Sequence, residues 1–223
     1  MPLMAFSQVK KPMNDPGFDN KLIHFGFSVG LNTMDYSIKR SLESYKTTMD
    51  SGIFIPDVSN IFPPGFQVQI ISDLKLGPNL NLRFLPGISF GQRAVSFYHL
   101  ADSSMYTAMN IGSAFLDFPL HFKYRSSRLN NYRPYIIGGL NYRYDMSSRN
   151  EEKVYIKIKP GDLYFEMGIG IDWYLQYFKL STEIKAGVGL FNLLIDHVAD
   201  RPEYQNSIEE IRSYIVNLSF HFE

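Results

Sequence analysis

Eight stretches of the chain alternate between apolar residues and polar or small ones, and this alternation constrains the fold more than any other feature. In the first stretch, Ile23 and Phe25 alternate with His24 and Gly26. Because successive side chains of a β-strand point to opposite faces, each stretch is expected to be a strand with one apolar face. The expected strands span residues 21–34, 66–76, 79–93, 113–125, 132–145, 162–174, 177–191 and 211–222.

The lengths of these strands and of their connections favour a membrane barrel. Strands of soluble proteins usually have about 5–6 residues, whereas a tilted membrane strand needs about 9–11. The connections alternate between short (75–78, 126–131, 175–176) and long (35–65, 94–112, 146–161, 192–210). Short turns on the periplasmic side and long outer loops are typical of outer-membrane barrels. The sequence therefore predicts an all-β fold over residues 20–223: an eight-stranded antiparallel up-and-down transmembrane β-barrel in the outer membrane, with both termini periplasmic.

The polar face of the alternation is predicted to point into the barrel. An eight-stranded barrel has a narrow interior, which suits the many glycines of this face better than the large residues of the apolar face. Aromatic residues at the strand ends are expected to form an interfacial girdle: Tyr98, Tyr124, Tyr132, Tyr142, Tyr144, Trp173 and Tyr174. A filled polar interior with a charge network is expected, made of Arg83, Asp117, Lys123, Glu166, Asp172, Lys179, Glu183 and Lys185.

A strand register follows if residues 175 and 176 form a two-residue turn. Tyr174 then lies opposite Tyr177. Asp172 lies opposite Lys179, and Glu166 lies opposite Lys185. Both charged pairs have opposite signs, so interior salt bridges are predicted between the partners of each pair.

The composition excludes several other classes of protein. Lys and Arg together number 22, as do Asp and Glu, and this zero net charge argues against a nucleic-acid partner. The absence of cysteine excludes disulfide and thiolate-metal sites. No metal-ligand spacing is present, so no cofactor, metal or small-molecule substrate is expected. The mean hydropathy of -0.15 resembles that of a soluble protein, but alternating strands lower this average.

The first 19 residues lack the alternation and are expected to be a residual signal or flexible segment. Leu3 to Ser7 resemble the end of the apolar region of a signal peptide, with cleavage near Gln8. The alternative is a disordered start to the chain.

The long loops hold the candidate functional residues. Apolar clusters in the first loop predict a partner-contact surface at Phe54, Ile55, Ile61 and Phe62. Alternatively, these residues fold over the barrel mouth or touch lipid head groups. An enzyme at the barrel rim would use His99 with Asp102, or Asp196, His197 and Asp200. No Ser/His/Asp pattern supports catalysis, so ordinary loop residues and no catalytic site are predicted.

Several stretches resemble the PorT family, small outer-membrane barrels of the Bacteroidetes linked to type IX secretion and, in gliding species, to motility. The resemblance covers about residue 20 to the end. The most specific stretches are PGFQVQIISDLKLGPNLNLRFLPGISFG (64–91) and RPYIIGGLNYRYD (133–145). Others are FGFSVGLN (25–32), LDFPLHFKYRS (116–126) and FEMGIGIDWYLQYFKLSTEIKAGVG (165–189). Barrel assembly also reads an amphipathic last strand ending in an aromatic residue, and Glu223 after Phe222 departs from that pattern.

The resemblance implies a non-enzymatic accessory barrel of type IX secretion that contacts other secretion components and outer-membrane lipid. The filled interior disfavours both a general porin and a protein-conducting channel. Three alternatives stay open: a rim hydrolase or acyltransferase, an OmpX-like structural or adhesion barrel, and a soluble lipocalin-like ligand barrel.

Overall fold

The computed structural model describes residues 12–40, 54–58, 63–99, 105–147, 158–195 and 208–223. In this part of the chain, no helix is long and apolar enough to cross a membrane. The elements are the short 3-10 helix η1 (Phe18–Asn20) and the strands β1 (Ile23–Arg40), β2 (Phe54–Val58), β3 (Pro64–Lys75), β4 (Leu80–Phe84), β5 (Gly87–His99), β6 (Met105–Arg125), β7 (Tyr132–Asp145), β8 (Gly161–Tyr174), β9 (Lys179–Gly189) and β10 (Ile208–Phe222).

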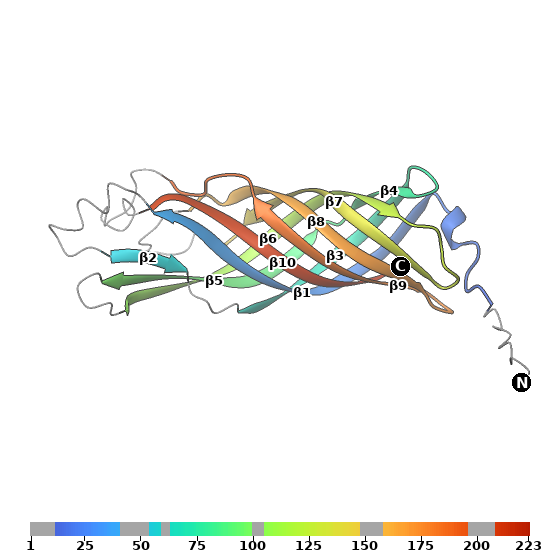
Figure 1. Cartoon of the computed structure of the whole chain (residues 1–223), viewed down its shortest axis with the longest axis horizontal. Coiled ribbons are helices and arrows are strands. Elements are labelled where there is room, and N and C mark those ends of the chain that lie inside the picture. Colours follow the sequence, from blue (N-terminus) through green and yellow to red (C-terminus); the bar gives the residue numbers. More distant parts are fainter. Residues whose placement is uncertain (1–11, 41–53, 59–62, 100–104, 148–157, 196–207) are drawn as a thin grey trace, which may run out of the picture.

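The strands close into an antiparallel barrel, as Figure 1 shows. The pairing runs from β1 through β10, β9, β8, β7 and β6 to β4 with β5, then to β3, and the β1–β3 pairing completes the ring. Because β4 and β5 continue one another along the same neighbours, the ring has eight strands. The predicted eight-stranded up-and-down barrel is confirmed.

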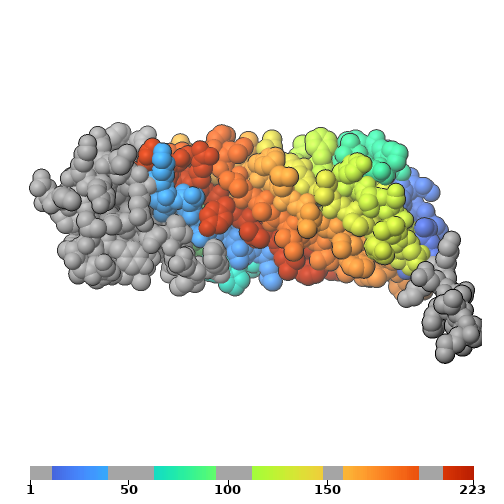
Figure 2. Space-filling view, in the orientation of Figure 1, coloured from blue at the N-terminus to red at the C-terminus, as the bar shows by residue number. Residues whose placement is uncertain are grey.

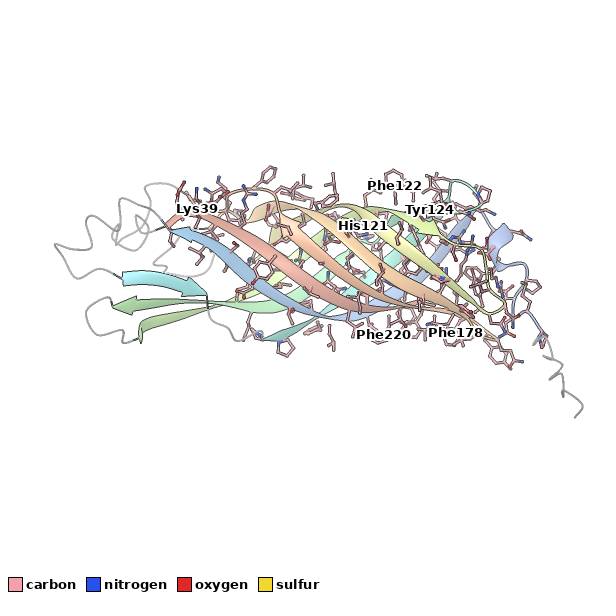
Figure 3. All side chains as sticks on the ribbon, in the orientation of Figure 1. Lys39, His121, Phe122, Tyr124, Phe178 and Phe220 are labelled. Atoms are coloured by element: carbon pink, nitrogen blue, oxygen red, sulfur yellow. The ribbon has the colours of Figure 1, made fainter. Side chains whose placement is uncertain are left out.

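The wall is apolar outside and polar inside. On β1, Phe25 is 69% exposed while its neighbour His24 is only 5% exposed. Figure 3 shows the same arrangement on β6, where Phe122 and Tyr124 point away from the barrel and His121 lies within its outline. A soluble barrel would have the opposite arrangement, because it buries its apolar face away from water. Exposed apolar strands without charge are stable only against hydrocarbon.

Several local features differ from the sequence prediction; for example, β1 extends to Arg40 and β6 begins at Met105. The third strand is interrupted at Leu85 and Pro86, where the β3 N–H of Ile70 donates to the Pro86 carbonyl (2.9 Å). Proline lacks an N–H, which breaks the regular ladder there. Strand β2 was not predicted; it pairs with the part of β5 beyond the ring. Tyr174 was predicted in the girdle, but it points inward and is 2% exposed.

The backbone of β6 lies so close to Gly139 of β7 that a larger residue at this position should destabilise the barrel. A Cβ at Gly139 would lie 2.2 Å from the Leu120 carbonyl oxygen, whereas one at Gly138 would come no nearer than 3.6 Å to any atom. We expect Gly139→Ala to destabilise the barrel by about 1–3 kcal/mol, because backbone must move to admit the methyl group. Gly138→Ala is the matched control. Urea unfolding in lipid vesicles measures both, and equal midpoints for the two variants would contradict the prediction.

Candidate functional site

The charged side chains of the barrel interior form connected clusters. Near the short turns, the Arg83 guanidinium lies 2.7 Å from a carboxylate oxygen of Asp73 and 2.8 Å from one of Glu223. The Lys179 ammonium binds the other Glu223 oxygen at 2.8 Å. Burial disfavours the charged form of Glu223, and the two bound cations offset this cost. The last residue of the chain therefore joins β4 to β9 inside the barrel.

A second pair and a central cluster continue the network. Lys123 binds both oxygens of Asp172, at 2.7 and 2.9 Å. Farther along the axis, Glu166 accepts from the Lys185 ammonium (2.9 Å) and the Asn141 amide (2.8 Å). The Lys123–Asp172 pair thus joins β6 to β8 past the intervening β7, while Glu166 binds residues of the two strands next to its own.

The network ends in two arginines held by aromatic rings near the long loops. Arg143 binds Asp117 at 2.6 Å, and Arg93 binds Asp145 at 3.0 Å. The ring of Phe115 lies below both guanidinium groups, 4.9 Å from Arg93 and 4.6 Å from Arg143. Such stacking supports charged groups that water does not reach.

All eight residues of the predicted interior charge network are buried. None is more than 3% exposed, and this set comprises Arg83, Asp117, Lys123, Glu166, Asp172, Lys179, Glu183 and Lys185. Their partners are close enough to bond directly, so these groups fill the lumen with side chains.

The mouth at the short turns is closed by residues 12–22, the N-terminal plug. Asp19 accepts from Arg125 (3.0 Å), Arg133 (3.1 Å) and the Tyr174 hydroxyl (3.0 Å) through one carboxylate oxygen. Phe18 is buried, and its ring stacks on His24 with centroids 4.2 Å apart. Of the described residues before the predicted boundary at residue 20, Asn14, Phe18 and Asp19 contact the barrel, whereas the other five are exposed. The boundary itself stays a prediction.

An apolar cluster, here called the apolar cap, lies inside the long-loop end of the barrel along β1 and β10. Its buried members are Tyr36, Leu193, Leu194, Ile208 and Ile211. The Leu193 N–H donates to the Ile211 carbonyl (2.9 Å), which ties the start of the β9–β10 connection to the first residues of β10. The charged lumen thus lies between the apolar cap and the N-terminal plug.

The family to which the chain is similar agrees with a wall that is apolar outside and polar inside. Residues 6–194 match the family described as outer membrane protein beta-barrel domain. The chain belongs to this family. It is an outer-membrane β-barrel, and its exposed apolar wall contacts lipid.

Solved barrels of this kind are similar in structure and distant in sequence. Neisserial surface protein A has 8% identity and a TM-score of 0.45, covering 90% of this chain and 98% of that one. The outer membrane protein OprG from Pseudomonas aeruginosa has 11% identity and a TM-score of 0.45, covering 89% and 94%. A Pseudomonas aeruginosa FadL homologue has 8% identity and a TM-score of 0.32, covering 90% and 48%. None of the curated proteins matches the chain.

The predicted register of β8 and β9 is wrong by two residues in this outer-membrane barrel. Tyr174 lies opposite Lys179, because residues 175–178 form a four-residue turn closed by the Leu175 N–H and the Phe178 carbonyl (3.0 Å). Asp172 consequently faces Ser181 and binds Lys123, while Lys179 binds Glu223.

The predicted Glu166–Lys185 salt bridge forms, but along a diagonal. Lys185 lies opposite Gly168 in the ladder, and its long side chain reaches Glu166. The predicted register pairs ions only between direct cross-strand neighbours. In a narrow lumen, long side chains also reach diagonal positions and strands on the far side.

The predicted loop residues are only partly described. Phe54 and Ile55 lie in β2, where Phe54 pairs with His99 of β5, but their side chains lie outside the described part. The other predicted loop residues, apart from His99, lie outside the described part of the chain: Ile61, Phe62, Asp102, Asp196, His197 and Asp200. Within the described chain, no three His, Asp or Glu side chains converge to hold a metal ion.

Sequence reasoning missed two members of the interior. Glu223 continues the inward parity of Ser219 and His221, so the period of two already placed it inside the barrel. The terminal aromatic pattern, by contrast, ends at Phe222 and does not account for Glu223. Asp19 precedes the first alternating stretch, and no local pattern marks it.

The N-terminal plug provides a second test. We expect Asp19→Asn to lower the free energy of opening of residues 12–22 by about 2–3 kcal/mol, because the bonds to two arginines lose their charged acceptor. Amide hydrogen exchange of this segment should then be about 30- to 150-fold faster. The control is Asp15→Asn, since Asp15 is exposed and a neighbouring residue of the same type. Equal exchange in the two variants would show that the Asp19 carboxylate does not hold the plug.

Proposed function

We propose that this protein is a non-conducting outer-membrane barrel that acts through protein contacts as an accessory component of type IX secretion. The observation that carries the proposal is the filled lumen: the eight residues of the interior charge network are buried beside groups of opposite charge, with the apolar cap at one end and the N-terminal plug at the other. A barrel with a filled lumen can contact other molecules only through its outer wall, its turns and its loops. The type IX assignment rests on the PorT-like stretches of the sequence.

Conductance tests the filled lumen. We expect no stepwise current when the purified protein is inserted into planar bilayers at neutral pH, whereas a general porin in the same bilayer gives a steady current. A steady, single-sized conductance in the unmodified protein would contradict the proposal that the barrel acts without a pore.

Affinity purification and a secretion assay test the cellular role. Type IX components should copurify with the tagged barrel from native outer membranes, and a strain lacking it should fail to release type IX cargo. His99→Ala and His197→Ala should restore secretion as well as the unmodified protein does. Isolation as a lone barrel with normal secretion would remove the type IX assignment, and loss of secretion in the histidine variants would favour a rim enzyme.

The proposed topology places both termini and the short turns in the periplasm. The chain has no cysteine, so single cysteines introduced by Ser127→Cys and Met146→Cys report the two ends of the barrel. In intact cells, a membrane-impermeant maleimide should label Met146→Cys and spare Ser127→Cys. The opposite pattern would reverse the topology.

A structural or adhesion role is the second candidate, favoured by one feature. β2, β5 and the first part of β6 form a three-stranded sheet that extends beyond the ring at the long-loop end (Figure 1). If this sheet binds an external surface, replacing residues 54–58 by Gly and Ser should reduce attachment of cells and leave secretion intact.

A further inference from the structure

A groove crosses the lipid-facing wall between β6 and β9. It consists of two adjoining hollows of about 710 and 600 Å³, which share Tyr124, Ile136, Ile169 and Ile184 as lining residues. Figure 2 shows the outer surface of β7 and β8 in yellow-green to orange. The lining residues of both hollows carry no charge.

Small outward residues create the groove. Gly138 of β7 lies between Phe122 of β6 and Met167 of β8 in the ladder, and Ala186 of β9 follows Met167. The large side chains of Phe122 and Met167 therefore flank Gly138, which has no side chain. Toward the short turns, Thr182 of β9 is the corresponding small residue, next to Ile171.

The groove spans one leaflet of the bilayer. It begins at Trp173, which with Tyr132 marks the interfacial girdle near the short turns, and extends along β8 to Met167. Six residues of strand cover about 20 Å, or about 15 Å along the membrane normal at a tilt of about 40°. Half of a hydrocarbon core of about 30 Å has the same depth.

The environment of the groove selects the chemistry of its occupant. Ile136, Ile169 and Ile184 are 58%, 65% and 55% exposed, so the groove is continuous with the wall that contacts lipid. A polypeptide segment lying there would need internal partners for every N–H and C=O group, whereas a hydrocarbon chain has no such need. An uncharged, one-leaflet groove therefore matches an acyl chain.

We propose that this groove is a binding site for one acyl chain of a phospholipid, in the leaflet that faces the short turns. By the topology proposed above, on which this assignment of the leaflet rests, that is the inner leaflet. The seated chain lies over Gly138, with its head group beside Ser126 at the level of Trp173.

The only tryptophan of the protein lies in the groove and reports its occupancy. The chain has one tryptophan, Trp173. Phosphatidylethanolamine with dibrominated acyl chains, titrated into the protein in maltoside micelles, quenches tryptophan on contact. We expect saturable quenching at a low ratio of phospholipid to detergent, and one retained phospholipid per barrel in native mass spectrometry.

Gly138→Leu tests the site without touching the reporter. A Cβ at Gly138 meets only ordinary contacts, at 3.6 and 3.9 Å, so the variant should fold. The leucine side chain fills the groove, and half-quenching should need about tenfold more phospholipid because the chain loses its dispersion contacts. Val68→Leu is the matched control, since Val68 is outward and half-exposed on β3. If Gly138→Leu does not fold, Thr182→Phe fills the end of the groove nearest Trp173.

The outcomes separate this site from the topology and from ordinary lipid contact. Linear quenching that is the same in all variants, with no phospholipid retained, would overturn the site. Saturable quenching by lipopolysaccharide and not by phospholipid would overturn the choice of ligand. Reversed cysteine labelling with saturable quenching by phospholipid would remove the topology and retain the groove.

Discussion

Lys123→Met is expected to destabilise the barrel by about 3–5 kcal/mol, because it leaves the buried Asp172 carboxylate without its cation. Lys123 and Asp172 are both fully buried, and the ammonium contacts both carboxylate oxygens. Ser181 also donates to Asp172 (2.5 Å), but one hydroxyl does not balance the charge of a fully buried carboxylate. Urea unfolding in lipid vesicles, followed by the shift in electrophoretic mobility of unboiled samples, measures the loss.

A second variant separates charge from packing. Removing both charges with Lys123→Met and Asp172→Leu should restore most of the lost stability, since a buried ion pair often contributes little beyond an apolar pair of similar size. Lys39→Met is the control, because its ion pair with Glu209 is solvent-exposed and should contribute little to stability. A double variant as unstable as Lys123→Met alone would mean that the side-chain shapes matter more than the charges.

The second large effect is expected at the end of the chain. Glu223→Ala should destabilise the barrel by about 3–5 kcal/mol, because Arg83 and Lys179 both lose a buried acceptor. Glu223→Gln should recover part of the loss, since the amide oxygen still accepts one hydrogen bond. The same unfolding assay compares these variants.

Glu209→Ala provides the control for Glu223→Ala. Glu209 is of the same residue type and lies near the other end of β10, with its side chain half-exposed. It should change stability by less than about 1 kcal/mol. If the two alanine variants unfold at the same urea concentration, the buried position of Glu223 has no special role.

The inward or outward direction of the wall residues was predictable from the sequence because it depends only on nearby residues of the same strand. Whether a residue faces lipid or the lumen depends only on its parity along a strand, so β7 was predicted with its observed bounds, Tyr132–Asp145. The inward direction of Arg83 and Glu166 follows from the same parity. The family match then agrees with the membrane environment inferred from this pattern.

The pairing inside the barrel was not predictable in the same way. Whether Lys179 binds Asp172 or Glu223 depends on a turn length and on distances across the ring, and neither is encoded in one strand. The N-terminal plug depends on Asp19 meeting Arg125 and Arg133, which are more than 100 residues away in sequence. Strand β2 contains Pro56, which argues locally against a strand, and it forms only by pairing with β5.

The pairing of Glu223 has a consequence for how the barrel is made. Lys179 meets Glu223 as soon as β9 and β10 pair, whereas Arg83 of β4 acquires this partner only when β10 has also joined β1 and the ring is complete. Before that, an open sheet in the bilayer would expose charged side chains and unpaired strand edges to hydrocarbon. Partly built barrels are therefore unstable in lipid, so insertion and closure are expected to occur as one cooperative event on assembly machinery that shields the unfinished seam.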